Sequence, residues 1–240
     1  MSTESRIFKN SAALLGGHLA ERILKLIVMA VLARFLGKSE FGLYIFVLTY
    51  VEFFHLLTDL GIQPILVREM ARNPDRAEEL MGNALTLKLI FAGVSVLLAV
   101  SVILLSGYTL SIAELVAWAS LGMFLSFRLS SVRQVLDSIF QVRLEMRVPV
   151  VLSVASELLS AIGLLMVVWA NLGLVWLLAV QNLAYLPGVI GLKLVTRARV
   201  PLKLRWSREV ALGLLKESYP LGLASLFTLA YVKVDILMLA

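Results

Sequence analysis

The sequence has no cysteine, and this absence removes several kinds of chemistry. Its 240 residues include no cysteine and only two histidines. Without a thiol the chain cannot form a disulfide scaffold, a thiolate metal site or a catalytic cysteine. It also has no metal-ligand spacing, no glycine-rich phosphate loop and no serine nucleophile motif. We therefore expect neither an enzyme nor a bound cofactor or metal.

Charged residues are scarce as well. Only 16% of the residues are Asp, Glu, Lys or Arg, whereas 60% are hydrophobic. Soluble domains are about a quarter charged and about half apolar, so the apolar surplus here indicates surface that faces lipid. A composition of this kind predicts an all-α polytopic membrane protein. The apolar runs long enough to cross a bilayer as helices cover residues 10–36, 42–63, 81–105, 114–140, 148–170, 174–195 and 219–240.

The net charge of +6 is concentrated in alternate connections between these runs. The basic connections contain Arg6, Lys9, Arg68, Arg72, Arg76, Arg143, Arg147, Lys193, Arg197, Arg199, Lys203, Arg205, Arg208 and Lys216. The only Lys or Arg in the intervening connections is Lys38. Because Lys and Arg are retained on the cytoplasmic side, the N-terminus and the basic connections are predicted to be cytoplasmic. No connection is long enough for a folded basic domain, so nucleic acid is not an expected partner.

The first long basic connection, residues 64–80, is predicted to include an interfacial helix. Arg68, Arg72 and Arg76 are four residues apart and therefore share one helical face. Contact with anionic phospholipid head groups is the favoured interpretation, and a role in substrate entry is the alternative.

The second long basic connection, residues 196–218, is predicted to lie along the inner membrane surface. Trp206 is an aromatic residue of the kind found at membrane interfaces. An apolar strip of Val210, Leu214 and Leu215 accompanies Arg208 and Lys216. As the longest connection, it is also the expected linker between two lobes.

Polar residues form stripes on the first two predicted spans. His18, Glu21, Arg22 and Lys25 share one helical face of the first span, and Glu52, His55 and Asp59 share one face of the second. A charge inside a membrane costs about 3 kcal/mol unless it faces a bundle interior or a wet cavity. The stripes are therefore expected to face each other.

These charges predict a polar cavity near the middle of the bilayer, where transporters bind their substrates. The residues expected at that depth are Arg22, Lys25, Glu52, His55, Arg128 and Glu157. The rival interpretation is that acids and bases simply pair and hold the bundle together. Arg133 and Asp137, at i and i+4, could form such a pair.

Smaller signals concern helix packing. Gly17, Ser153 and Gly163 are among the small residues expected to let helices approach closely. Pro187 is expected to kink the sixth span, with Gln181 and Asn182 beside the kink lining the cavity.

Several segments together resemble the Wzx-like polysaccharide biosynthesis flippases of the multidrug/oligosaccharidyl-lipid/polysaccharide (MOP) superfamily. They are NSAALLGG from Asn10, ARFLGKSEFGLY from Ala33, DLG from Asp59, REMAR from Arg68 and KESYPLGLASLFTLAYVKVDILMLA from Lys216. The resemblance extends over the whole chain.

The resemblance implies two six-helix lobes that open alternately to either side of the membrane. Residues 1–195 would be the N-terminal lobe, 196–218 the linker and 219–240 the first helix of a second lobe, so we expect the chain to be a fragment. The implied substrate is a polyprenyl-diphosphate-linked oligosaccharide, flipped across the cytoplasmic (inner) membrane for O-antigen or other surface polysaccharide. The cations implied to hold the diphosphate are Arg22, Lys25, Arg128, Arg133 and Lys233.

Alternative functions stay open from the sequence. A peptidoglycan-precursor flippase would use the same chemistry, and a cation-coupled drug exporter would use membrane carboxylates to couple H⁺ or Na⁺. A membrane-embedded glycosyltransferase would need a longer external loop than the sequence provides. Expected partners are the lipid-linked substrate, membrane lipids and the polymerase and glycosyltransferase machinery.

Overall fold

The computed structural model describes residues 3–125, 131–197, 199–200 and 203–238, and within these ranges it contains helices and no strands. The predicted all-α class is confirmed. The helices are α1 (Thr3–Asp59), α2 (Ile62–Arg72), η1 (Pro74–Arg76), α3 (Ala77–Leu105), α4 (Leu110–Ser120), α5 (Gly122–Leu125), α6 (Ser131–Val142), α7 (Arg147–Trp169), α8 (Leu174–Ala184), α9 (Leu186–Arg197) and α10 (Arg208–Met238).

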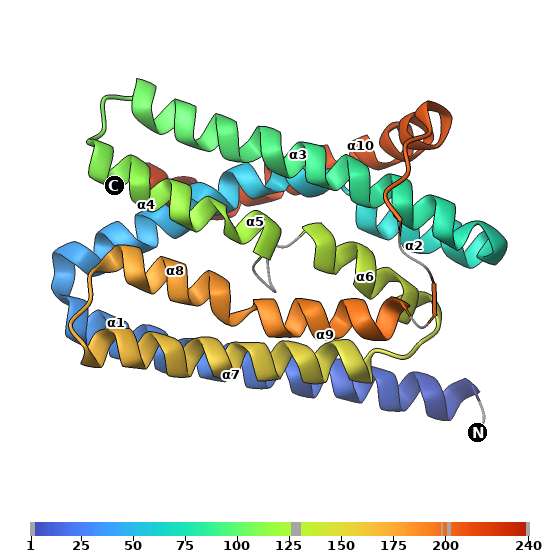
Figure 1. Cartoon of the computed structure of the whole chain (residues 1–240), viewed down its shortest axis with the longest axis horizontal. Helices are drawn as coiled ribbons and strands as arrows, with labels where there is room; N and C mark the ends of the chain where they lie inside the picture. The colour runs from blue at the N-terminus through green and yellow to red at the C-terminus, as the bar shows by residue number, and fades with distance from the viewer. Residues whose placement is uncertain (1–2, 126–130, 198, 201–202, 239–240) are drawn as a thin grey trace.

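Helix α1 contains a sharp corner that turns it into two arms. Gly37 has φ 70° and ψ 177°, a backbone conformation that glycine adopts at little cost because it has no Cβ. The corner lies in the break predicted between the first two apolar runs. The first arm, residues 3–36, runs along α7, and the second arm, residues 38–59, crosses back through the bundle (Figure 1).

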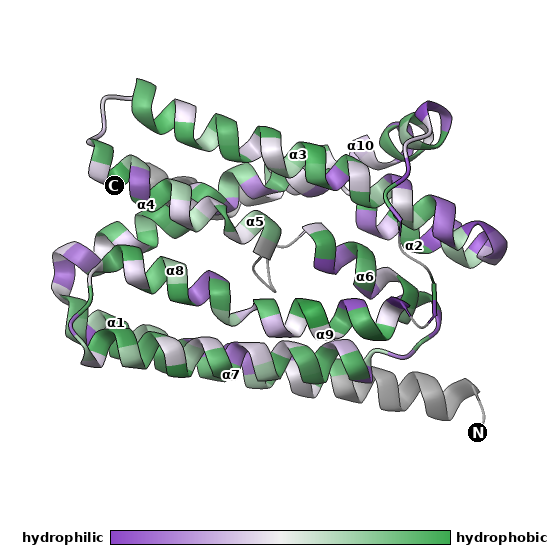
Figure 2. Cartoon of the chain, viewed as in Figure 1, coloured by the Kyte–Doolittle hydropathy of each residue, from purple (hydrophilic) through white to green (hydrophobic). Residues whose placement is uncertain are grey.

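Among the residues that the structure describes, three helical segments are long and apolar enough to cross a membrane: Pro74–Leu105, Arg147–Trp169 and Leu174–Arg197. A shorter apolar segment covers Leu110–Phe124. Apolar residues dominate the helices along the bundle, and hydrophilic residues gather around α2 and the neighbouring connections (Figure 2). These features are those of a membrane protein.

The predicted kink in the sixth span is present. Helix α8 ends before Tyr185 and α9 begins after it. Pro187 has no N–H to donate to the carbonyl of Leu183, four residues earlier, and its ring crowds that carbonyl. The interruption therefore follows directly from the position of the proline.

The connections that carry the predicted cytoplasmic cations meet at one end of the bundle, which we call the basic end (Figure 1). Ion pairs join them there: Arg199 contacts Glu145 at 3.0 Å, and Arg205 contacts Glu78 at 2.8 Å. The Gly37 corner and the connections before α4 and before α8 lie at the opposite end.

The apolar strip predicted in residues 196–218 faces the protein rather than the membrane surface. Leu214 is buried in the core cluster at the basic end, and Val210 and Leu215 pack against that cluster. The reason is that α10 lies against α2 and α3 and needs an apolar face on that side. Helix α10 also continues past residue 218 into the predicted seventh span, with Pro220 inside it.

Candidate functional site

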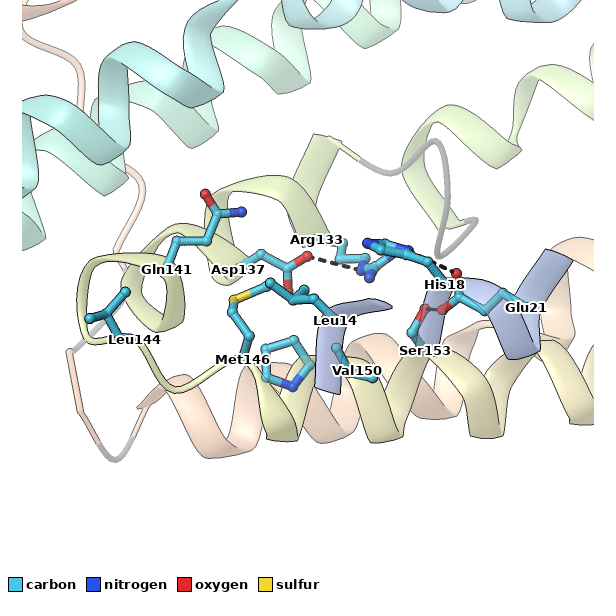
Figure 3. Close-up of a pocket in the computed structure, with 11 residues that line it drawn as sticks. Leu14, His18, Glu21, Arg133, Asp137, Gln141, Leu144, Met146, Val150 and Ser153 are labelled. Atoms are coloured by element: carbon cyan, nitrogen blue, oxygen red, sulfur yellow. Dashed lines mark hydrogen bonds and ion pairs between the residues drawn. The ribbon is translucent and has the colours of Figure 1, made fainter. Parts of the chain in front are cut away.

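A cavity of about 410 Å³ lies between the first arm of α1, α6 and α7 (Figure 3). Its lining combines polar and charged side chains with apolar ones. The lining residues are Leu14, His18, Glu21, Arg133, Asp137, Gln141, Leu144, Met146, Pro149, Val150 and Ser153. Because Leu144 and Met146 belong to the connection between α6 and α7, the cavity reaches the basic end of the bundle.

The charged centre of the cavity is an ion pair on α6. Arg133 Nε lies 3.1 Å from Asp137 Oδ2, as the i, i+4 spacing predicted. The Asp137 side chain is only 10% exposed. Its second oxygen, Oδ1, is buried and accepts no hydrogen bond from the part of the chain that the structure describes. This oxygen is therefore available to a donor or cation that enters the cavity.

A second carboxylate enters the cavity from the first arm of α1. Glu21 accepts a hydrogen bond from the Ser153 hydroxyl of α7. The His18 imidazole, one helical turn earlier, lies 3.6 Å from Glu21 and is largely exposed. The sequence placed His18 and Glu21 on one polar stripe, and the structure shows that this stripe reaches α7.

The apolar part of the lining holds α1 and α7 close together. A Cβ on Gly17 would clash with Val150, so the close approach that was predicted for this glycine is confirmed. Gly163 of α7 approaches α8 as closely, since a Cβ there would lie 2.6 Å from Val180.

The position of the cavity along the bundle follows from Ser153, which lies about 9 Å along α7 from its first residue, Arg147. The cavity thus lies nearer the basic end than the middle of the bundle.

Arg133 is the predicted site residue that lines this cavity. Arg22 follows Glu21 on α1 but is exposed, and Lys25 is half-buried one turn further along. Glu52 and His55 are half-buried on the second arm. Arg128 lies outside the described residues, and Lys233 belongs to α10, where the structure does not describe its side chain.

The remaining predicted site residue, Glu157, belongs to a second polar cluster deeper in the bundle. It accepts a hydrogen bond of 2.8 Å from the Tyr185 hydroxyl at the sixth-span kink. Nearby on α8, Gln181 accepts a hydrogen bond of 3.2 Å from Tyr44. Asn182 donates one of 2.7 Å to the carbonyl of Trp118. Gln181 and Asn182 therefore join α8 to α1 and α4 and are not part of the cavity lining.

A third polar cluster surrounds Lys88, whose side chain is fully buried. Its ammonium group contacts the carboxylate of Asp59 and the side-chain oxygen of Gln134. The second polar stripe, which contains Asp59, thus reaches α3.

Sequence reasoning did not select Gln141 or Ser153 as site residues. Gln141 is two turns from Arg133 on α6, and this spacing could have indicated a shared face. Ser153 offered no such signal, because its role depends on how α7 packs against α1.

The electrostatic balance of the lining is acidic. Two carboxylates, from Glu21 and Asp137, accompany one guanidinium, from Arg133. Arg133 can donate to an oxyanion through a planar guanidinium, and the carboxylates can accept from hydroxyl or cationic groups. The lining thus offers one cationic donor group and two anionic acceptor groups to whatever enters the cavity.

Transporters bind their substrates in polar cavities between membrane helices, and the cavity around Arg133 is of that general kind. The chain belongs to the family described as "Polysaccharide biosynthesis protein", whose profile matches residues 7–240. This is the Wzx-like branch of the MOP flippases, so the resemblance drawn from the sequence is confirmed. The family consists of transporters rather than enzymes. A search of curated proteins and a search of solved structures each found no significant match.

Proposed function

We propose that the protein flips a polyprenyl-diphosphate-linked oligosaccharide from the cytoplasmic to the outer leaflet of the cytoplasmic membrane by alternating access, for the assembly of a surface polysaccharide such as O-antigen. Family membership supports a polysaccharide-related transporter. The single observation that carries the finer proposal is the cavity around Arg133, which reaches the end of the bundle where the cationic connections meet.

Arg133 is the residue proposed to receive the diphosphate. A guanidinium can bind two phosphate oxygens at once, and it stays charged at all physiological pH values. Asp137 orients the free guanidinium through its contact at 3.1 Å. On binding, the phosphate takes over part of that contact, and the displaced carboxylate can accept a hydrogen bond from a sugar hydroxyl.

The polar residues around Arg133 are proposed to contact the sugar. Glu21, Gln141 and Ser153 offer hydrogen-bond donors and acceptors. These can replace the hydrogen bonds that the sugar hydroxyl groups make with water before they enter the cavity. The polyprenyl tail needs no such groups and can stay in lipid beside the helices. The same cavity would therefore shelter the two parts of the substrate that hydrocarbon excludes.

The other cations predicted from the sequence are proposed to act later in the passage. Arg22 and Lys25 follow the cavity residue Glu21 along α1 and lie farther from the basic end. Arg128 and Lys233 complete this proposed set. A diphosphate moving along α1 would meet Arg22 and Lys25 after it leaves Arg133.

The experiment replaces Arg133 in cells that depend on this protein for surface polysaccharide. Arg133→Ala is expected to reduce surface polymer at least about tenfold, since a charge-assisted contact contributes roughly 1.5–3 kcal/mol. Arg133→Lys should retain part of the activity, because the charge remains but the bidentate geometry is lost. Arg34→Ala, which removes an exposed cation of the same helical arm as Glu21, is the matched control. Normal polymer with Arg133→Ala, at equal protein in the membrane, would overturn the proposal.

A second candidate, a cation-coupled exporter, is favoured by the two carboxylates and by the unpaired Oδ1 of Asp137. Asp137→Asn separates the two functions. An exporter that couples H⁺ or Na⁺ through this carboxylate would lose uptake of the labelled ion. A flippase that uses Arg133 would keep most of its lipid-linked substrate binding, because the Asn side-chain oxygen can still accept from the guanidinium or from a sugar hydroxyl. A peptidoglycan-precursor flippase would bind in the same way, and loss of peptidoglycan rather than surface polymer on Arg133→Ala would identify it.

A further inference from the structure

Residues 203–207, which we call the strap, are tied to the start of α3. The Thr86 hydroxyl donates a 2.9 Å hydrogen bond to the carbonyl of Arg205. The N–H of Ser207 donates a 2.6 Å hydrogen bond to Asn83. Gly82 allows this contact, because a Cβ there would lie 2.5 Å from the carbonyl oxygen of Lys203. The strap is therefore held in one conformation.

Successive side chains of the strap point in different directions. Arg205 reaches back to Glu78 of α3, at 2.8 Å. Leu204 and Trp206, on either side of it, are 64% and 58% exposed. Two large apolar side chains held outward by a fixed backbone, one on each side of Arg205, are unusual on a surface that faces only water.

The helix that follows the strap continues this surface. Arg208, Leu212 and Lys216 are spaced four apart on α10 and are all exposed, so they share the outer face. The inner face, with Ala211 and Leu214, is buried against the core. Within the described part of the chain, Lys203, Arg208 and Lys216 have no ion-pair partner. The two carboxylates on this part of α10 are near other cations. Glu217 contacts Arg68, and Glu209 is exposed near Arg76.

We propose that this surface (Lys203, Leu204, Trp206, Arg208, Leu212 and Lys216) docks on the anionic phospholipids of the leaflet that surrounds the basic end. Tryptophan prefers the interface between head groups and acyl chains, and lysine and arginine near that interface attract anionic lipids. The strap fixes Trp206 in place before it meets the lipid, so little conformational entropy is lost on docking. These lipids belong to the surrounding bilayer, and the proposal does not depend on what the cavity transports.

Fluorescence quenching of Trp206 in proteoliposomes tests the proposal. In the full chain, Trp118, Trp169 and Trp176 are replaced by Phe so that Trp206 alone reports. The vesicles are phosphatidylcholine with phosphatidylglycerol, and bromine is placed near the head group of one lipid or of the other at equal mole fraction. We expect brominated phosphatidylglycerol to quench Trp206 about twofold more strongly than brominated phosphatidylcholine. Lys203→Gln with Arg208→Gln and Lys216→Gln should remove this preference.

The matched control is a chain in which Trp169 is the sole tryptophan. Trp169 is exposed at the opposite end of the bundle, where the connections carry few cations, and it should show no preference for phosphatidylglycerol. Absence of quenching by either lipid would show that the strap does not reach the bilayer. Equal quenching of Trp206 by both lipids, or an equal preference at Trp169, would also overturn the proposal. Circular dichroism of each variant confirms that its helices are intact.

Discussion

At the scale of single residues, a few polar side chains inside the bundle hold neighbouring helices together. Lys88 of α3 is fully buried and contacts Asp59 at the end of α1 and Gln134 of α6. Three helices thus share one ammonium group. Removing one member of a buried pair is more damaging than replacing both, because an uncompensated charge is left behind.

Asp59→Ala is therefore expected to destabilise the protein by about 3 kcal/mol. The double variant Asp59→Ala with Lys88→Met should recover most of that loss, since it leaves no buried charge. The apparent Tm of the purified protein in detergent measures both effects. Arg76→Gln, which breaks an exposed ion pair with Glu79, is the control and should leave Tm unchanged. If the double variant were less stable than Asp59→Ala alone, the pair would have another role.

At the scale of elements, α10 is joined to the turn between α1 and α2 by close backbone contact. Leu60 and Gly61 have φ values of 42° and 74° in that turn. A Cβ on Gly222 of α10 would lie 2.8 Å from the carbonyl oxygen of Leu60 and 2.9 Å from its Cα. Backbone atoms cannot move aside as a flexible side chain can, so the helix and the turn fit only with glycine here.

Gly222→Ala should consequently push α10 away from the turn and lower the stability by roughly 1–3 kcal/mol. Gly213→Ala on the same helix is the matched control, because a Cβ there meets nothing within 4 Å. That variant should be neutral or more stable by about 0.5–1 kcal/mol, since alanine is the better helix former. The measurement is the Tm of the two variants under the same conditions. An equal change in Tm for Gly222→Ala and Gly213→Ala would contradict the close contact.

At the scale of the whole molecule, the two ends of the bundle differ in charge. The basic end gathers the cationic connections, whereas the connections at the other end are short and nearly free of charge (Figure 1). Large aromatic side chains are exposed at both ends, with Trp206 at the basic end and Trp169 and Trp176 at the other. Such residues are enriched at both interfaces of membrane proteins.

If the basic end is cytoplasmic, cysteines introduced at the two ends will react differently in intact cells. Ser106→Cys, at the uncharged end, should be labelled by a membrane-impermeant thiol reagent. Arg76→Cys, at the basic end, should be labelled only after the membrane is opened. Both positions are exposed, and the sequence has no other cysteine to react. Labelling in the reverse pattern would invert the topology.

The sequence was most informative where the answer depended on local pattern. Apolar runs and breaks predicted the helical class, Pro187 predicted the interruption before α9, and an i, i+4 spacing predicted the Arg133–Asp137 pair. Each of these follows from a few neighbouring residues. The family, too, was recognisable from short segments.

What the sequence could not provide was the rotation of each helix about its axis. Glu21 lines the cavity while its neighbour Arg22 is exposed, because successive residues differ by about 100° around a helix. The sequence placed both residues on one polar stripe and selected Arg22, not Glu21, as a site residue. The apolar strip of α10 was assigned to the wrong side for the same reason: its pattern shows an apolar face but not what that face contacts.

One wall of the cavity is a loop, and this has an evolutionary consequence. Leu144 and Met146 belong to the short connection between α6 and α7, while the other lining residues project from helices. Loops accept insertions and deletions that helices in a packed bundle do not. We therefore expect members of the family to differ in the length of this connection, with the helix packing around Arg133 left intact.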